Sequence, residues 1–302
     1  MDFFKKLFLI SILLIFQSIF CTQTNIKPKL ITPFQQENLN KELARSIISI
    51  NNNNELLKKV DELIIKGASP TEAAYIESRT VTSPIGWALY KKRSDKVIEA
   101  LLVAGADPDL AQNASPVWHA TNMGRLSTVK LLKKHDAKLD TFYYGINVLM
   151  LAAQEGKFDI VDYLINENDI DKNIKDFKGA TYKEHALYGA IENNDLKRMK
   201  EFLDLGADPN QAIHYWLSGS KFPLVAAFAK NNEIITLLMN YGANPYVSFV
   251  SYGCKSRVID FVKNDEQKQL VEKLYKERQE QIKSELDPYF SAKTIQDIIA
   301  SY

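Results

Sequence analysis

Cysteine and histidine are both scarce, because the 302 residues include only two cysteines, Cys21 and Cys254, and four histidines. Two cysteines can form at most one disulfide, so the disulfide framework of many small secreted domains is excluded. A bond between these two would require Cys21 to stay in the mature chain and to carry no other modification. Otherwise Cys254 is a lone cysteine, which we expect to be buried or unreactive.

Net charge and catalytic motifs are also lacking. Lys and Arg total 38 against 37 for Asp and Glu, a net charge of +1, and there is no basic stripe, so we expect no nucleic-acid partner. The sequence contains no Gly-x-Ser-x-Gly turn, no His-Glu-x-x-His pair and no glycine-rich phosphate loop. We therefore expect no catalytic residues, no cofactor and no enzyme activity. The composition, 46% hydrophobic and 25% charged, is that of a folded protein.

Long apolar runs are absent except near the N-terminus. Two lysines there precede an almost unbroken apolar run over residues 7–20. As a helix this run would be about 21 Å long, short of the roughly 30 Å hydrocarbon core of a bilayer. We interpret residues 1–21 as a signal peptide, which predicts an exported protein, either periplasmic or secreted. Two outcomes stay open at Cys21: lipidation, as in bacterial lipoproteins, would anchor the chain to a membrane, and cleavage near Thr22 would release it.

A repeated pattern occupies most of the chain. A small or acidic residue followed by Ala or Ile recurs at positions 67, 105, 136, 169, 206 and 242, at intervals of 31 to 38 residues. This spacing is typical of helical solenoid repeats. A second landmark, an alanine in a short apolar segment, precedes each of the last five. These alanines are Ala88, Ala120, Ala152, Ala190 and Ala227.

Each repeat contains the signals of two short helices. Ser83-Pro84 and Ser115-Pro116 provide an N-cap oxygen followed by proline at the first helical position. The small alanines allow close approach of neighbouring first helices. Glycine at the end of the second helix supplies a left-handed residue. The second helices carry pairs of large apolar residues that we expect to face the stack: Leu101-Leu102, Leu131-Leu132, Tyr163-Leu164, Phe202-Leu203 and Leu237-Leu238.

These segments resemble the ankyrin repeat, whose pattern is Thr-Pro-Leu-His-x-Ala-Ala, an apolar second helix and then Gly-Ala-Asp-x-Asn. The best matches are residues 105–109, 148–153 and 206–210. The resemblance covers residues 41–262, with six to seven repeats of which the first and last are degenerate. It implies an all-α ankyrin-repeat solenoid with extended fingers between repeats. The motif histidine is replaced in every unit, which predicts a less regular stack; the replacements are Gly86, Trp118, Met150, Tyr188 and Val225.

Two segments flank the predicted repeats. Residues 22–40 are rich in polar amides and have no apolar period, so we predict a flexible tether. Residues 263–302 predict two helices separated by Asp287-Pro288, which would form a helical cap over the end of the solenoid. The four histidines fall in separate units. Because stacked units keep such residues apart, we expect core or capping roles for them and no metal site. They are His119, His135, His185 and His214.

The predicted fingers and the helices beside them are rich in aromatic residues, and two fingers, 171–185 and 208–222, are longer than the repeat requires. Tyr and Trp are enriched in the residues that dominate binding energy at interfaces. We therefore take seven aromatic residues as the candidate partner-binding set. They are Trp118, Tyr143, Tyr144, Tyr182, Tyr188, Tyr215 and Trp216. The alternative is that these rings fold back over a shallow core.

The resemblance implies a non-catalytic protein-binding module that acts through its concave face and its fingers. We expect a monomer with one protein partner of unknown identity, and contact with a membrane only through a lipid on Cys21. Three narrower hypotheses compete: an envelope protein that neutralises a toxin or an enzyme, a secreted effector that binds host proteins, and an enzyme. The last would require a polar pocket that the sequence does not indicate.

Overall fold

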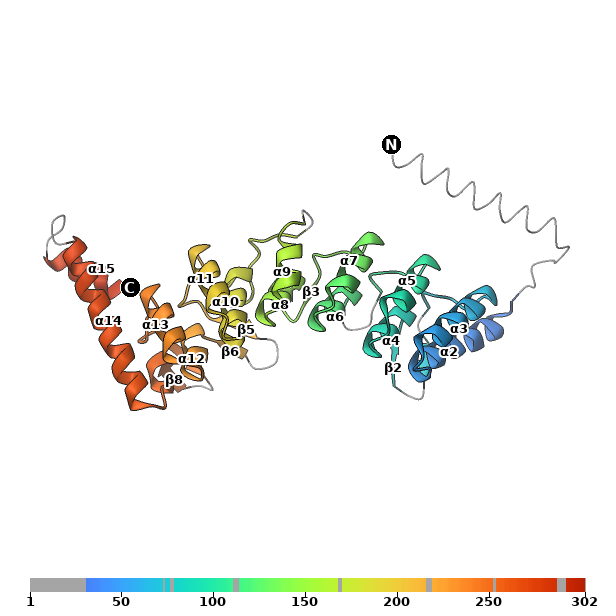
Figure 1. Cartoon of the computed structure of the whole chain (residues 1–302), viewed down its shortest axis with the longest axis horizontal. Coiled ribbons are helices and arrows are strands. Elements are labelled where there is room, and N and C mark those ends of the chain that lie inside the picture. The colour runs from blue at the N-terminus through green and yellow to red at the C-terminus, as the bar shows by residue number, and fades with distance from the viewer. Residues whose placement is uncertain are drawn as a thin grey trace, which may run out of the picture.

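The computed structural model describes residues 31–72, 74–76, 79–110, 114–167, 170–215, 219–251, 254–286 and 292–301. The predicted signal peptide, Cys21 and Trp216 therefore lie outside the described residues. The described residues form an elongated, curved stack of antiparallel helix pairs, with the first and last helices of the stack far apart (Figure 1). The paired helices are α2 (Pro33–Ser49) with α3 (Asn53–Ile65), α4 (Pro84–Tyr90) with α5 (Asp95–Val103), α6 (Pro116–Asn122) with α7 (Leu126–Lys134), α8 (Val148–Gln154) with α9 (Phe158–Leu164), α10 (Tyr182–Glu192) with α11 (Leu196–Asp204), and α12 (Pro223–Phe228) with α13 (Asn232–Asn240).

Four short antiparallel hairpins form the fingers between helix pairs. They are β1 (Ala74–Ile76) with β2 (Arg79–Thr82), β3 (Phe142–Tyr143) with β4 (Ile146–Asn147), β5 (Ile213–Tyr215) with β6 (Gly219–Lys221), and β7 (Ser248–Ser251) with β8 (Cys254–Arg257). Each hairpin pairs only with itself among the described residues, so no continuous sheet crosses the stack. The all-α solenoid predicted from the sequence is therefore confirmed, with the strands confined to the fingers.

The helix starts follow the predicted capping chemistry. Ser83 Oγ accepts a hydrogen bond from the backbone N–H of Gly86 at 3.2 Å, and Ser115 Oγ accepts one from Trp118 at 3.2 Å. Proline occupies the first helical position after each serine, where its missing N–H costs nothing. Gly105, which follows α5, has a φ of 97°, a conformation that strains residues with a Cβ.

The core runs along the stack between the two rows of helices. All five landmark alanines are fully buried, and successive first helices contact one another, as expected for small residues at these contacts. The second helices contribute Leu101, Leu132, Leu164, Phe202 and Leu238 to the same continuous cluster. The predicted pairs do not all face the stack with both members, because Leu131, Tyr163 and Leu237 are only partly buried.

The N-terminal end departs from the predicted tether over residues 22–40. Helix α2 begins at Pro33, so the prediction is wrong for residues 33–40. Thr32 Oγ1 accepts a hydrogen bond from Gln35 N at 3.3 Å, and Gln35 Oε1 accepts one from Thr32 N at 3.0 Å, a reciprocal capping box. The first turns of α2 are polar and show no apolar period, whereas its second half buries Leu43 and Ile47.

The last repeat is incomplete and runs into the C-terminal helices. A single turn of 3-10 helix, η1 (Val258–Phe261), takes the place of its first helix and contacts α12. The long helix α14 (Asp265–Leu286) then packs against α13, and α15 (Ala292–Ser301) packs against α14. Figure 1 shows α14 lying across the end of the stack. Among the described residues, no helix has both the length and the apolar character needed to cross a bilayer.

Candidate partner-binding surface

Two of the predicted binding residues belong to the core. The side chain of Trp118 is 4% exposed and that of Tyr188 is 7% exposed, so neither can anchor a partner, and these two predictions are wrong. Trp118 occupies the third position of α6, which faces inward once Ser115 caps the helix, and Tyr188 packs with Ala180 and Ile213. These two residues are buried because they lie on the face of their helix that is turned toward the core.

Two further tyrosines are half-buried and cover the core, as the alternative interpretation expected. Tyr143 packs edge-to-face on Trp118, with ring centroids 5.4 Å apart. A hydrogen bond with the Tyr144 hydroxyl raises the pKa of Tyr143, and burial raises the pKa of Tyr182. Both phenols therefore stay neutral at physiological pH, and their rings serve mainly as packing.

Tyr144 is the predicted residue that the structure leaves exposed. It occupies the turn of the β3–β4 hairpin at a φ of 51°, and its side chain is 54% exposed. Phe142, on the other side of Tyr143, is also exposed. Tyr215 ends strand β5, but its side chain, like all of Trp216, lies outside the described part of the chain.

Phe177 is an exposed aromatic residue outside the set predicted from the sequence. It lies in the loop 171–181, hereafter the long finger, and is 76% exposed. Its ring lies against Gly145, where a Cβ would overlap it, and meets the ring of His214 edge-to-face at 5.5 Å. The exposed rings of Phe142, Tyr144 and Phe177 and the half-buried ring of His214 lie on three successive fingers, and we call this set the aromatic strip. The unusual length of the finger was the available signal.

Positive charge accompanies the strip on the long finger. Lys175 and Lys178 are exposed on either side of Phe177. Neither takes part in an ion pair within the described residues, whereas many other surface lysines do, such as Lys230 with Glu192 at 2.9 Å. The finger tip therefore offers an aromatic ring between two unpaired ammonium groups, which complements a surface that presents both an apolar group and carboxylates.

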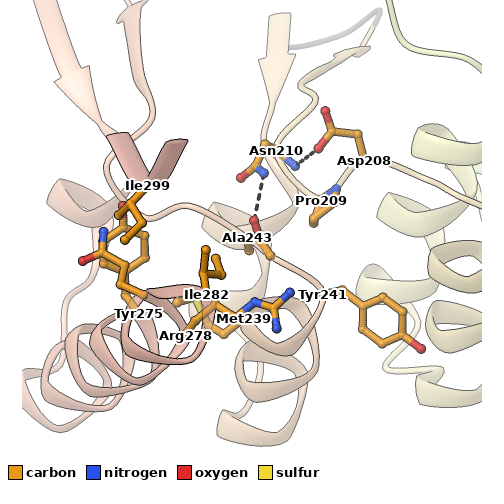
Figure 2. A pocket seen from close by; sticks show the side chains of 12 residues that line it. Asp208, Pro209, Asn210, Met239, Tyr241, Ala243, Tyr275, Arg278, Ile282 and Ile299 are labelled. Carbon is orange, nitrogen blue, oxygen red and sulfur yellow. Dashed lines mark hydrogen bonds between the residues drawn. The ribbon is translucent and has the colours of Figure 1, made fainter. Parts of the chain in front are cut away.

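A small cavity lies at the C-terminal end of the stack, between the finger at 208–210, the end of α13 and the helices α14 and α15 (Figure 2). Its volume is about 230 Å³, below the roughly 300–1,000 Å³ typical of ligand pockets. Met239, Ile282 and Ile299 form its apolar lining, and Arg278 and Asp208 its charged edge. No His, Cys, Ser or Thr is among the described residues that line it. Elsewhere in the described residues, no His, Cys, Asp and Glu cluster could hold a metal ion.

Stacked helix pairs with hairpin fingers define a helical solenoid, a class of repeat proteins built from one structural unit. Residues 85–176 match the family model described as ankyrin repeats (3 copies). The human ASB11 ankyrin repeat domain has a similar crystal structure, with a TM-score of 0.53 and 22% sequence identity over 77% of this chain and 96% of that chain. Residues 85–176 are therefore ankyrin repeats, and the stack as a whole has the fold of an ankyrin-repeat domain.

Two curated proteins also show sequence similarity. Human ankyrin repeat and SOCS box protein 14 is 29% identical over 178 residues, which cover 54% of this chain and 27% of that protein. Cattle dynein axonemal heavy chain 12 is 28% identical over 178 residues, 54% of this chain and 45% of that protein. The chain thus matches less than half the length of either relative. Ankyrin repeats are protein-interaction modules and are in general non-catalytic.

Proposed function

We propose that this protein is exported and binds a protein partner, as a monomer, through the aromatic strip. The observation that carries the proposal is the exposure of Phe142, Tyr144 and Phe177 on two neighbouring fingers, with the Phe177 ring lying against Gly145, the residue after Tyr144. Exposed aromatic side chains supply large contact area with little loss of conformational entropy. The two lysines beside Phe177 favour a partner surface that also presents carboxylates.

Site-specific photo-crosslinking tests this assignment. A benzophenone amino acid would replace Phe177 in one protein and Phe34, which is 72% exposed on α2 at the far end of the stack, in the control. Both would be exposed to cell-envelope extract and culture fluid from the producing organism. We expect a discrete adduct from position 177 alone. Equal adducts from both positions, or an adduct from position 34 alone, would contradict the proposal.

A matched pair of variants measures the strength of the contact. In Tyr144→Ala with Phe177→Ala, truncation of two interface anchors should weaken capture of the crosslinked partner by about 30-fold or more, since a hot spot contributes about 2 kcal/mol or more. Phe34→Ala with Tyr90→Ala removes two equally exposed rings outside the strip. The control should bind normally. Each variant loses one edge-to-face ring contact, Phe177 with His214 or Tyr90 with Trp87, so both should stay folded and lose a similar stability of about 0.5–1.5 kcal/mol.

Export is supported by the apolar run over residues 7–20. The mass of the protein purified from its own cells tests this part. A chain that begins at a diacylglycerol-modified Cys21 is a membrane-anchored lipoprotein, and one that begins at Thr22 or later is released. A chain that still begins at Met1 would refute export. The identity of the crosslinked partner then separates an envelope inhibitor from a secreted effector.

A further inference from the structure

A chain of buried polar groups joins three consecutive units beneath the aromatic strip. His185, in α10, is fully buried. Its Nε2 lies 3.0 Å from Asp176 Oδ2, and its Nδ1 lies 3.2 Å from Gln154 Oε1 in α8. Asp176 Oδ2 also accepts a hydrogen bond from the backbone N–H of His214 in β5 at 2.6 Å. One carboxylate on the long finger is therefore tied to both neighbouring units.

The other oxygen of Asp176 closes the tip of the long finger. Oδ1 accepts hydrogen bonds from the backbone N–H groups of Lys178 at 2.7 Å and Ala180 at 3.0 Å. The backbone N–H of Asp176 in turn donates to the carbonyl oxygen of Ala180 at 2.8 Å. Phe177 lies inside this turn. Its backbone is consequently held on both sides although its side chain is in solvent.

Asp176 therefore controls both aromatic groups at this end of the strip, since it precedes Phe177 and holds the backbone of His214. We propose that Asp176, oriented by His185, is a positioning residue that fixes Phe177 and His214 in a single binding surface. The inference rests on the proposed function, because positioning matters only if the strip binds. A contact surface held in its bound shape loses less conformational freedom on association.

Only a carboxylate can make this set of four hydrogen bonds. Each oxygen of Asp176 accepts two, from His185 and His214 on one side and from Lys178 and Ala180 on the other. An asparagine amide has one oxygen and one NH₂ group, and the NH₂ cannot accept. In either orientation of the amide, the NH₂ group of Asp176→Asn would therefore face a backbone N–H donor that now binds a carboxylate oxygen.

The ionisation states fit this role. Burial raises the pKa of Asp176, but hydrogen bonds from His185 and from backbone N–H groups outweigh burial, and the net pKa is lowered. Burial also lowers the pKa of His185, against the opposing effect of Asp176 and Glu184 and with the support of His214. At neutral pH a neutral His185 donates from Nε2 to a carboxylate.

Amide hydrogen exchange tests the positioning without any partner. In Asp176→Asn, we expect at least about fivefold faster exchange at His214 or at both Lys178 and Ala180. The matched control is Asp171→Asn on the same finger, where the side chain accepts only the exposed Asn173 N–H at 2.8 Å. The control should leave those three amides within about twofold of wild type.

Effects of the variant on the whole fold and on partner binding are measured separately. Amides of α5, remote from the finger, should exchange at wild-type rates in Asp176→Asn. If they do not, His185→Leu is measured instead: it removes the hydrogen bond that orients the Asp176 carboxylate, so the same three amides should again exchange faster while α5 exchanges at wild-type rates. With the crosslinker at position 177, Asp176→Asn should reduce the partner adduct by about fivefold or more.

Three results would overturn the inference or its basis. Unchanged exchange at Lys178, Ala180 and His214 in the variant refutes the positioning of the finger. Faster exchange with an undiminished adduct shows that positioning does not serve binding, while the strip remains the binding surface. Faster exchange with no adduct even in the wild-type protein refutes the proposed function and leaves the structural role of Asp176 intact.

Discussion

Gly145 offers the sharpest test of how the aromatic strip is assembled. It has a φ of 81°, and a Cβ there would overlap the Cε2, Cδ2 and Cζ atoms of Phe177. The left-handed conformation costs an L-residue about 1–2 kcal/mol, and loss of unfolded-state freedom returns about 0.4–1 kcal/mol. Gly145→Ala must also displace the Phe177 ring, which forfeits its edge-to-face contact with His214, worth about 0.5–1.5 kcal/mol.

Gly179→Ala is the matched control, because Gly179 has a φ of 88° and a Cβ there meets nothing within 4 Å. Its backbone penalty is the same, so the difference between the two variants isolates the Phe177 contact. In urea unfolding, we expect Gly145→Ala to be less stable than Gly179→Ala by about 0.5–1.5 kcal/mol. The NMR cross-peak between the Phe177 and His214 rings should vanish in Gly145→Ala alone. Equal stability with the cross-peak kept in both variants would refute the packing of Phe177 on Gly145.

Two further predictions concern the buried polar groups. Arg93 Nε and Nη2 donate to the carbonyl oxygens of Ile47 at 2.8 Å and Ile48 at 3.0 Å, in the last turn of α2. Arg93→Met should therefore cost about 3 kcal/mol in urea unfolding, because it leaves two carbonyls unpaired, and a loss below about 0.5 kcal/mol would contradict this. Burial lowers the pKa of His185, so the unfolded chain takes up its proton first as the pH falls below about 6.5, and stability should fall there. His185→Gln should flatten the slope between pH 5 and 7, whereas the contribution of Asp176, whose pKa is lowered, is lost only below about pH 4.

The candidate site could be predicted only in part. Exposure of Tyr144 followed from its place in a finger between two helical signals. Trp118 is also a large aromatic residue, yet it is buried, because its helix turns that position toward the next unit. Phe177 was missed because the sequence of the long finger has no period, and only the contacts with Gly145 and His214 reveal its neighbours.

The helix starts also show which features could be predicted from neighbouring residues and which could not. The capping signals at Ser83 and Ser115 are local, so they could be read directly and were confirmed in atomic detail. Helix α2 also has local signals, in Thr32 and Gln35, but its polar first turns gave no apolar period, and the predicted tether extended too far. The apolar residues that α2 buries lie in its second half, so only its packing on the neighbouring helices shows that the helix begins at Pro33.

The sequence by itself determined the repeat, the capped starts of its first helices and the absence of known catalytic motifs. These depend on residues a few positions apart, such as a capping serine and the proline after it, or a glycine that must adopt a positive φ. The tertiary structure decided which aromatic residues face solvent and which distant groups meet. The tie between Asp176, His185 and His214 spans 38 residues of chain, and only the stacking of one unit on the next brings these groups together.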